Sequence, residues 1–343
     1  MCSRQEELKN WLRDILPDSN FHLTKLTGDA SHRSYFRISN NNTSKIIMDS
    51  PPELVPVEPF LNISRKLQRS GFLVPNIHSV NLDKGFLLLD DFGDTIFYSA
   101  ISENSQNLLY NSAVGLLPNM HSCANFGKDL LYFDKSVMLQ ELDLFNEWFL
   151  SKYLRIQPNS QDKLIISNTF DKLTDLIDSQ PKVFMHRDYH CRNLMIIYQN
   201  SAKAEIDAIN DSNFKIGILD YQDAMCGPFT YDLVSILKDC YIKLPNEKVL
   251  DWIAYFYERI EFSHNYSLPE FIQAFDLCGL QRHLKVLGIF SRLYLRDNKE
   301  NYLKNMPLVF DYISSCLECY NDFHQFRDLI MNKIKPIFLN KIK

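Results

Sequence analysis

Three short apolar runs interrupt the helical second half of this 343-residue chain and constrain its fold more than any other feature. They are residues 182–186 (KVFMH), 194–198 (LMIIY) and 215–220 (KIGILD), and long stretches with helical spacing lie before and after them. Runs of this length, rich in Val, Ile, Leu, Phe and Met, are typical of buried strands. The second half therefore has to hold a small β-structure among helices, with polar segments at the strand ends.

The chain before Gly93 follows a different pattern. Residues 21–48 hold β-branched and aromatic runs such as FHLTKLT and SYFRIS, and residues 77–90 contain two strand-like runs around a DKG turn. Runs of this kind, divided by turn residues, are typical of an antiparallel sheet. We therefore predict an α+β protein with two lobes, a small sheet-containing lobe at residues 1–92 and a mainly helical lobe at residues 93–343.

Charge and composition exclude several classes of protein. There are 37 Lys and Arg residues against 42 Asp and Glu, a net charge of −5, which argues against a general binder of nucleic acid or anionic membranes. No apolar run approaches the roughly 18 residues that span a bilayer. The charged start lacks the apolar stretch of a signal peptide. We expect a cytoplasmic protein whose eight cysteines are reduced thiols, with no nucleic-acid, membrane or obligate protein partner.

The most informative segment is residues 186–193, HRDYHCRN, which joins two of the predicted strands. It fits the pattern H-x-D-x-x-x-x-N of kinase catalytic loops, in which the Asp accepts the proton of the substrate hydroxyl and the Asn holds Mg²⁺. With this spacing, one loop presents a carboxylate to the hydroxyl and an amide oxygen to the metal. Asp188 and Asn193 are the residues that fill these positions here.

The second part of the signal is Asp220, which ends an apolar run and is followed by an aromatic residue, as in the metal-binding D-F-G segment of kinases. Mg²⁺ prefers oxygen ligands and keeps several waters, so one carboxylate, one amide and the phosphates of a nucleotide suffice to hold it. Alone, Asp188 or Asp220 could be an ordinary turn residue. Their order and their positions at strand ends favour the catalytic interpretation.

Two further segments lie where a kinase binds its nucleotide. Residues 28–37 join two predicted strands, and backbone N–H groups of such a small-residue loop can lie over phosphates. Residues 88–93, LLDDFG, fall between the lobes, where the adenine-binding hinge is expected. The candidate nucleotide-binding residues are Gly28, Asp29, Ala30, Ser31, Arg33, Arg37, Asp90 and Asp91.

Longer stretches of the sequence resemble the aminoglycoside-phosphotransferase-like kinases. They are HRDYHCRNLM, GILDYQDAMCGPFTYDLVSILKD and GLQRHLKVLGIFSRL, together with LTGDASHRSYFRI, IIMDSPP and GFLLLDDFGD near the start. Within that family the sequence most resembles the bacterial kinases that phosphorylate N-acetylmuramate and N-acetylglucosamine at the anomeric hydroxyl in peptidoglycan recycling. The resemblance implies a two-lobed protein-kinase-like fold and the use of ATP and Mg²⁺. It also implies that Asp188 is the catalytic base, that Asn193 and Asp220 bind the metal, and that Asp232 is a structural acid.

The sequence departs from the kinase pattern at the third strand. Kinases place a Lys at the end of that strand, where this chain has Asp49. Lys45 lies four residues earlier, which puts it on the same face of an ideal strand but about 13 Å away at 3.3 Å per residue. Arg33 or Arg37 could supply the phosphate-binding charge, although each could equally be a solvated strand residue. A catalytically inactive nucleotide-binding module therefore stays open, although the intact catalytic and metal-binding set argues against it.

The acceptor is predicted to be a small-molecule amino sugar. The candidate sugar-binding residues lie in segments that carry the resemblance, and they are Glu141, Gln222, Asp223 and Arg282. Arg282 could meet the lactyl carboxylate of a muramic acid through a two-pronged hydrogen bond, but an Arg on a long helix is often an interhelical contact. An aminoglycoside, choline or homoserine is the rival acceptor. A cationic aminoglycoside or choline would favour acidic groups around it, whereas a sugar acid would favour Arg and amide donors.

Overall fold

The computed structural model describes residues 3–16, 21–26, 32–40, 43–122, 130–198 and 213–342. It divides into two compact units. The first consists of Met1–Ile101 with Arg192–Asp223, and the second of Ser102–Cys191 with Ala224–Lys343. Residues 192–223, which include the last two residues of the predicted catalytic loop, thus pack with the N-terminal part of the chain. The predicted lobes, residues 1–92 and 93–343, divide the chain by function, and this division stays a prediction.

The first unit is built on a five-stranded antiparallel sheet of strand order β1-β2-β3-β5-β4, with β7 and β8 forming a separate antiparallel pair. Its elements are α1 (Arg4–Ile15), β1 (His22–Lys25), β2 (Ser34–Ser39), β3 (Ser44–Asp49), α2 (Glu58–Arg69), β4 (Ile77–Asn81), β5 (Phe86–Asp90), α3 (Phe97–Ala100), β7 (Leu194–Tyr198) and β8 (Phe214–Ile218).

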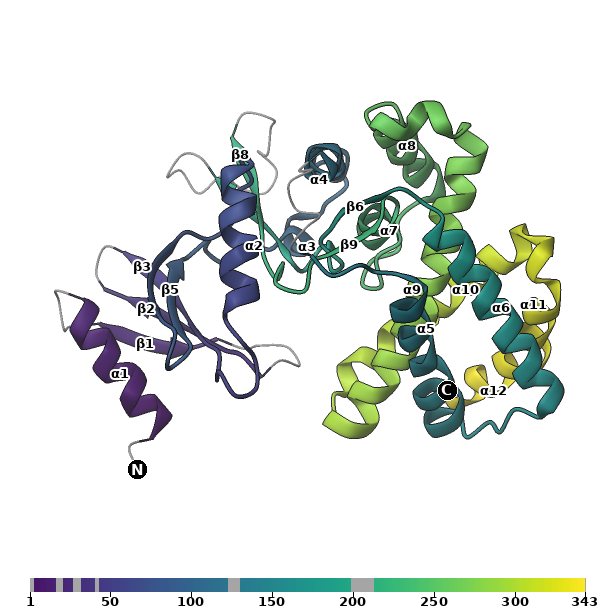
Figure 1. Ribbon diagram of the computed structural model, residues 1–343, viewed down its shortest axis with the longest axis horizontal. Coiled ribbons are helices and arrows are strands. Elements are labelled where there is room, and N and C mark those ends of the chain that lie inside the picture. The colour runs from purple at the N-terminus through teal and green to yellow at the C-terminus, as the bar shows by residue number, and fades with distance from the viewer. Residues whose placement is uncertain are drawn as a thin grey trace. The chain divides into compact units, whose positions relative to one another are not determined.

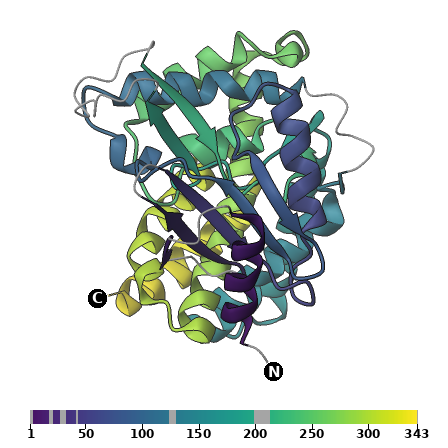
Figure 2. The same cartoon turned by 90° about the vertical axis from the view of Figure 1, so that its left-hand side faces the viewer.

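Helix α1 covers one face of this sheet (Figure 1 and Figure 2). Leu8, Trp11 and Leu12 recur at helical spacing and form one buried cluster with residues of β2, β3 and β5. Strand alternation places Phe36 and Ile47 on that face, since they pair directly across β2 and β3. The opposite face of β2 is therefore the one that carries its intervening residues.

The second unit is mainly helical. Its elements are α4 (Gln106–His121), α5 (Lys135–Leu144), η2 (Phe145–Tyr153), α6 (Ser160–Asp178), β6 (Lys182–Met185), β9 (Met225–Pro228), α7 (Tyr231–Leu237), α8 (Asn246–Tyr257), η4 (Glu261–Asn265), α9 (Leu268–Asp297), η5 (Glu300–Asn305), α10 (Met306–Cys319), η6 (Asn321–Phe323), α11 (His324–Leu329), η7 (Ile330–Ile334) and α12 (Lys335–Lys341).

Helix α9, 30 residues long, is the central helix of this unit and packs against α5, α6, α7 and α10. A capping box between Ser267 and Glu270 starts it, and Asn298 ends it in the left-handed region at φ 53°. Most residues from Leu277 to Leu293 are buried, so the helix has little exposed face along this stretch. Its polar residues there must find partners inside the unit.

Strands β6 and β9 pair antiparallel, with Lys182 opposite Pro228 and Met185 opposite Met225. Residues 225–228 (MCGP) carry no strand pattern in the sequence because the run is short and contains Gly and Pro. The pairing fixes the end of β6, from which the predicted catalytic loop leaves. A small antiparallel sheet in the N-terminal part and mainly helical structure in the C-terminal part agree with the predicted fold class. Within the described ranges no helix is long and apolar enough to cross a membrane.

Candidate active site

Two buried carboxylates hold the backbone of the loop that follows β6. Asp232, in the first turn of α7, accepts hydrogen bonds from the backbone N–H of His186 at 2.6 Å and of Arg187 at 2.9 Å. Asp239, after α7, accepts one from the backbone N–H of Cys191 at 2.9 Å. Both acids are almost fully buried. The contacts of Asp232 agree with the structural role that the family resemblance implies for it.

Asp188 lies between these anchored ends and is surrounded by positive charge. Burial alone would raise the pKa of its carboxyl. The positive charges of Lys285, His190 and Arg282 outweigh burial and hold that pKa below its ordinary value. Asp188 is therefore ionised at neutral pH, which is the state a proton acceptor requires.

Glu141 of α5, predicted to bind the sugar, lies in the same unit. Its carboxylate accepts hydrogen bonds from Arg187 at 2.6 Å and from Gln281 at 3.1 Å, and forms an ion pair with Lys285 at 3.0 Å. The side chain is only 8% exposed. Both carboxylate oxygens are therefore engaged by protein groups, and the predicted contact with a sugar is not tested by these contacts.

Arg282, also predicted to bind the sugar, is buried on α9 and donates from Nη1 to the Cys240 sulfur at 3.4 Å. Within the described part of the chain, its Nε finds no hydrogen-bond partner. A buried guanidinium donor without a partner is costly in free energy. Arg282 thus has one donor available for an acceptor that the protein itself does not supply.

The predicted metal ligands Asn193 and Asp220 belong to the first unit, and the register of β7 and β8 brings them together. Leu194 begins β7 and pairs with Ile218, the last residue of β8, so the residues just outside the pair are also neighbours. Asn193 donates from its amide to the Asp220 carboxylate at 3.3 Å. The two lie 27 positions apart in the sequence, and the antiparallel pairing explains their contact.

Asp220 has the chemistry and setting of a Mg²⁺ ligand. Its side chain is exposed, and its backbone is left-handed at φ 63°, a conformation that Asp and Asn tolerate better than most residues. The buried Gln222 donates to its carboxylate at 2.8 Å and to Asp223 at 3.4 Å. A carboxylate and an amide in contact are the hard oxygen donors that Mg²⁺ takes together with substrate phosphates. The residues present fit that ion.

Tyr35 shows which face of the five-stranded sheet lies near the predicted metal ligand Asp220. It alternates along β2 with the residues that pack on α1, so it points to the opposite face. Burial and the charge of Asp220 raise its pKa to about 12, against an opposing effect of Arg33. Arg33 is itself buried and donates from Nε to the Ser50 hydroxyl at 3.3 Å. Arg33 and Asp220 therefore both lie close enough to Tyr35 to act on it electrostatically.

Arg37, the other candidate for the phosphate-binding charge, lies on β2 and is paired with acids. Its guanidinium contacts the Asp91 carboxylate at 2.6 Å and 3.0 Å and the Asp94 carboxylate at 2.7 Å. Asp91, likewise predicted to bind nucleotide, also accepts from the backbone N–H of Gly93 at 2.9 Å. The charge of Arg37 is thus already balanced within the segment that follows β5.

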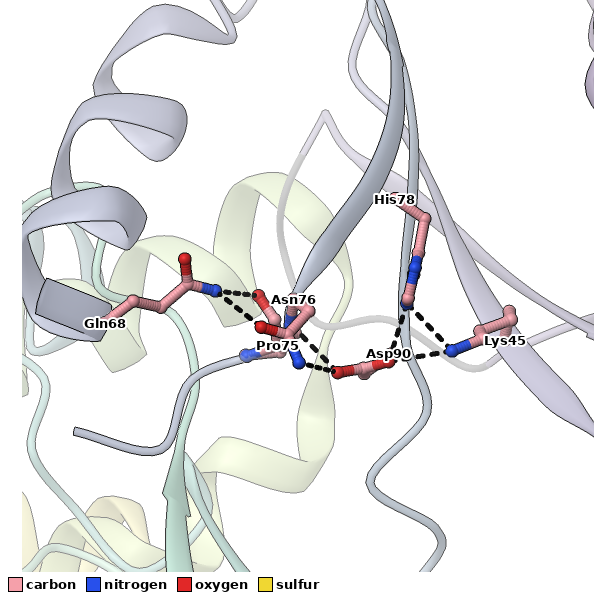
Figure 3. Close-up of polar contacts among 6 residues, drawn as sticks. All are labelled: Lys45, Gln68, Pro75, Asn76, His78 and Asp90. Atoms are coloured by element: carbon pink, nitrogen blue, oxygen red, sulfur yellow. Dashed lines mark hydrogen bonds and ion pairs between the residues drawn. The ribbon is translucent and has the colours of Figure 1, made fainter. Parts of the chain in front are cut away.

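Asp90, the last residue of β5, is the centre of a polar cluster (Figure 3). It accepts hydrogen bonds from Lys45 at 2.8 Å and from the side-chain amide of Asn76 at 2.6 Å, and its carboxylate lies 2.7 Å from Nε2 of His78. Gln68 of α2 donates from its side-chain amide to the side-chain oxygen of Asn76, Oδ1, at 3.2 Å. The cluster joins β3, β4 and α2 to the start of the predicted hinge. Lys45 is directly opposite Asp90 in the β3–β5 register, so this contact links the two strands.

Replacing Asp90 by Asn should lower stability at neutral pH by about 1 kcal/mol, because partly exposed ion pairs are worth little more. The side-chain hydrogen bonds from Lys45, His78 and Asn76 outweigh burial and hold its pKa well below the ordinary 3.8. A depressed folded-state pKa stabilises above the unfolded pKa, and the stabilisation is lost as pH falls through the folded pKa. Urea unfolding at pH 7 and pH 3 should show the wild-type advantage over Asp90→Asn shrinking. An advantage that stays constant would disprove this linkage.

The remaining predicted nucleotide-binding residues, Gly28, Asp29, Ala30 and Ser31, lie outside the described residues, so their phosphate-binding role stays a prediction. The acid that replaces the third-strand Lys is described. Asp49 accepts from Nε of Arg4 in α1 at 2.8 Å, on the α1 face of the sheet. This residue therefore binds the helix, away from the face on which Tyr35 lies.

Two residues of the second unit escaped prediction. Asp239 holds the far end of the predicted catalytic loop, and Lys285 is the positive charge that lowers the pKa of Asp188 most. Lys285 is one helical turn after Gln281 in a segment that carried the family resemblance, and this spacing could have placed it on the same face of α9. No local pattern distinguishes Asp239 from an ordinary helix-end acid.

The chain is similar to known proteins over most of its length. The sequence profile of the "Phosphotransferase enzyme family" matches residues 22–262. The N-acetylmuramate/N-acetylglucosamine kinase of Neisseria meningitidis serogroup B is 35% identical over 321 residues, 90% of each chain. The kinase of that name from Pseudomonas putida is 32% identical, covering 95% of this chain and 96% of its own.

Among solved structures, the ADP-bound aminoglycoside phosphotransferase APH(2'')-Ib superposes with a TM-score of 0.59 at 14% identity, over 90% of this chain and 97% of its own. That likeness confirms the predicted kinase-like fold. The family profile covers well over half of the chain, and the curated relatives span nearly all of it. The anchored loop at residues 186–193, the Asn193–Asp220 pair and these matches lead to one conclusion: the chain belongs to the phosphotransferase enzyme family.

Proposed function

We propose that this protein is an ATP- and Mg²⁺-dependent kinase that phosphorylates the anomeric hydroxyl of N-acetylmuramic acid, N-acetylglucosamine or both, in the recycling of peptidoglycan. The observation that carries the acceptor class is the charge around Asp188, where Lys285, His190 and Arg282 supply positive charge. Such a setting favours an anionic sugar acid over a cationic acceptor. The names of the relatives support the same acceptor.

In this proposal Asp188 accepts the proton of the acceptor hydroxyl as the hydroxyl oxygen bonds to the γ-phosphorus and the bond to ADP breaks. The anchoring of the loop by Asp232 and Asp239 holds that carboxylate in a fixed direction. Most of the rate enhancement in such a transfer comes from positioning and charge neutralisation, so a rigid loop is the main contribution of the protein.

Asn193 and Asp220 would hold the Mg²⁺ ion, with Gln222 orienting the Asp220 carboxylate through its 2.8 Å hydrogen bond. When bound, the ion would neutralise negative charge on the transferring phosphates. Because Gln222 already holds one oxygen of the Asp220 carboxylate, this side chain would lose little entropy on binding the ion.

The nucleotide would lie on the Tyr35 face of the sheet, with adenine at the backbone of residues 90–93 and the phosphates over residues 28–31. The side chains of Asp90 and Asp91 are engaged by Lys45 and Arg37, so the hinge would bind through its backbone. Arg33 is the cation on this face that takes the place of the missing third-strand Lys.

Arg33→Ala should raise the KM for ATP about tenfold or more, because a charge-assisted hydrogen bond contributes about 1.5–3 kcal/mol. Arg37→Ala is the matched variant, since Arg37 lies on β2, four residues after Arg33, and pairs with Asp91 and Asp94. Its KM for ATP should stay within about threefold while the melting temperature falls. A larger KM effect from Arg37→Ala would transfer the phosphate role to Arg37.

For the acceptor, Arg282 would meet the lactyl carboxylate of a muramic acid with the donor that lacks a protein partner. Gln222 and Asp223 are the candidates for the sugar hydroxyl and acetamido groups, because they adjoin the metal ligand Asp220. Both carboxylate oxygens of Glu141, the remaining candidate, are engaged by protein groups. We place the enzyme in the cytoplasm, where ATP is the phosphoryl donor.

The test is ADP formation from Mg²⁺–ATP with a panel of acceptors. N-acetylmuramic acid and N-acetylglucosamine should be turned over, and choline, homoserine and an aminoglycoside should not. Turnover of a cationic acceptor at the higher kcat/KM would replace the amino-sugar assignment. Binding of ATP with no turnover of any acceptor would make the protein an inactive nucleotide-binding module.

A further inference from the structure

Glu141 is where three donors from two distant parts of the second unit meet. Arg187 comes from the catalytic loop, and Lys285 and Gln281 come from α9. The contacts measure 2.6 Å, 3.0 Å and 3.1 Å respectively, and they occupy both carboxylate oxygens. Such a junction between a loop and two helices restricts all three elements at once.

The Glu141 carboxylate keeps its charge in this buried position. Its side chain and that of Lys285 are 8% and 9% exposed. Burial would raise the pKa of Glu141, but the charges of Lys285 and Arg187 outweigh it and hold the pKa below its ordinary value. An ionised buried carboxylate has to be paired, and removing it leaves two cations without their common partner.

The approach of α5 to α9 is specific at this point. A Cβ on Gly288 would lie 2.5 Å from the carbonyl oxygen of Leu144, far inside contact distance, so only glycine fits there. Leu144 is three residues after Glu141, and Gly288 is three residues after Lys285. The close approach therefore lies one helical turn from the ion pair and brings Glu141 and Lys285 together.

Arg187 needs such a support because its backbone is left-handed at φ 78°, a conformation that is uncommon outside glycine. Asp232 holds its backbone N–H at 2.9 Å, and Glu141 holds its guanidinium. Lys285 also donates to the Tyr231 hydroxyl at 3.1 Å, and Tyr231 precedes Asp232 in the chain. These contacts form a closed ring that returns to the residue directly before Asp188.

We propose that Glu141 is a positioning residue: through Arg187 it fixes the backbone that presents Asp188, and through Lys285 it ties that backbone to α9. This rests on the proposed function, in which Asp188 is the proton acceptor. It also gives Glu141 a role other than the sugar contact that its sequence segment predicted. A carboxylate whose oxygens are both engaged by protein donors acts on the reaction through the loop.

Glu141→Gln tests this, since it keeps the size of the side chain and removes its charge. We expect kcat to fall about 100-fold, because a misplacement of about 1 Å at the reacting groups costs that much. The KM values for ATP and for the sugar should stay within about twofold. A KM for the sugar raised tenfold with kcat unchanged would instead make Glu141 a sugar ligand and overturn the proposal.

Asp276→Asn is the matched control. Like Glu141 on α5, Asp276 on α9 is a poorly exposed carboxylate of the second unit, and it binds Lys238 at 2.6 Å and the Tyr320 hydroxyl at 2.8 Å. This variant should lose as much thermal stability as Glu141→Gln and keep the wild-type kcat. Equal losses of kcat in both variants would show that only general stability is involved, and would overturn the proposal.

Arg187→Met provides a second route, because it leaves the pair of Glu141 and Lys285 in place. Its loss of kcat should equal that of Glu141→Gln, and the double variant should lose no more than either single one. Additive losses would contradict a shared path. Hydrogen exchange of residues 186–188, which needs no substrate, should be faster in Glu141→Gln than in Asp276→Asn. Unchanged exchange would overturn the proposal even if the wild type phosphorylates neither sugar, whereas that inactivity alone would refute only the proposed function.

Discussion

Asp188→Asn is expected to lower kcat about 10³-fold while leaving the affinity for Mg²⁺–ATP within about twofold of the wild type. Asn has the size of Asp but cannot accept the proton of the sugar hydroxyl. The loop around it is held by Asp232 and Asp239, neither of which is changed, so the fold should persist. Initial rates with saturating sugar and calorimetric titration with nucleotide measure the two quantities.

The positive charge around Asp188 also predicts how Asp188→Asn changes the binding of an anionic sugar. Lys285 and Arg282 would lose a negative partner in Asp188→Asn, so an anionic sugar should bind no more weakly, and its KM should stay equal or fall. A kcat within about threefold of wild type would remove Asp188 from the role of base. A large rise in the KM for ATP would place this residue at the nucleotide instead.

Asp220→Ala should weaken the binding of Mg²⁺–ATP about 100-fold or more. Removing even an outer-shell partner of a metal ligand costs 10- to 100-fold in metal affinity, and Asp220 is the ligand itself in this account. The neighbouring Asn193 would lose its 3.3 Å hydrogen-bond partner at the same time. Calorimetric titration with ATP at fixed Mg²⁺ measures the effect.

Two controls separate the metal from the backbone in this experiment. Asp220 lies at φ 63°, where Ala is strained and Asn is tolerated, so Asp220→Asn keeps the backbone and loses only the charge. Its loss of affinity should be smaller than that of Asp220→Ala but well above the error. Affinity for ATP without Mg²⁺ should be unchanged in both variants. Equal Mg²⁺-dependent affinities in wild type and Asp220→Ala would remove Asp220 from the metal site.

The sequence predicted the candidate catalytic and metal-binding residues, but not the contacts that hold them in place. Asp188 and Asn193 could be predicted because a catalytic loop has a fixed spacing and lies between apolar runs. Asp220 could be predicted because it ends an apolar run and precedes an aromatic residue. Their surroundings depend on pairings that spacing does not encode. Residues 225–228 show no strand pattern, yet they pair with β6 and fix where the loop begins.

Glu141 shows what could not be predicted from the sequence in the second unit. Its segment carried the family resemblance, which pointed to the sugar, but its partners lie 46 and 140 positions away in the sequence. The contact between α5 and α9 depends on Gly288, whose close approach to Leu144 appears only when the helices are packed. A buried acid on a helix has no sequence signature that separates a ligand of the substrate from a support of the loop.

The faces of the third strand could be predicted from the sequence. The alternation that put Lys45 and Asp49 on one face of an ideal strand agrees with the register, because both pair with residues on the α1 face. The choice between Arg33 and Arg37 could not be made from spacing, since both alternate with the same face. The structure adds that Arg37 forms ion pairs with Asp91 and Asp94.

The most direct test of the account is phosphorus NMR of the product, with methyl glycosides as blocked acceptors. A hemiacetal hydroxyl is more acidic than a primary alcohol and asks less of a single carboxylate base such as Asp188. N-acetylmuramic acid and N-acetylglucosamine should each give a sugar 1-phosphate, and their methyl glycosides, whose anomeric oxygen carries no proton, should be inert. Methyl glycosides that react as fast as the free sugars, with a 6-phosphate in the spectrum, would contradict the account.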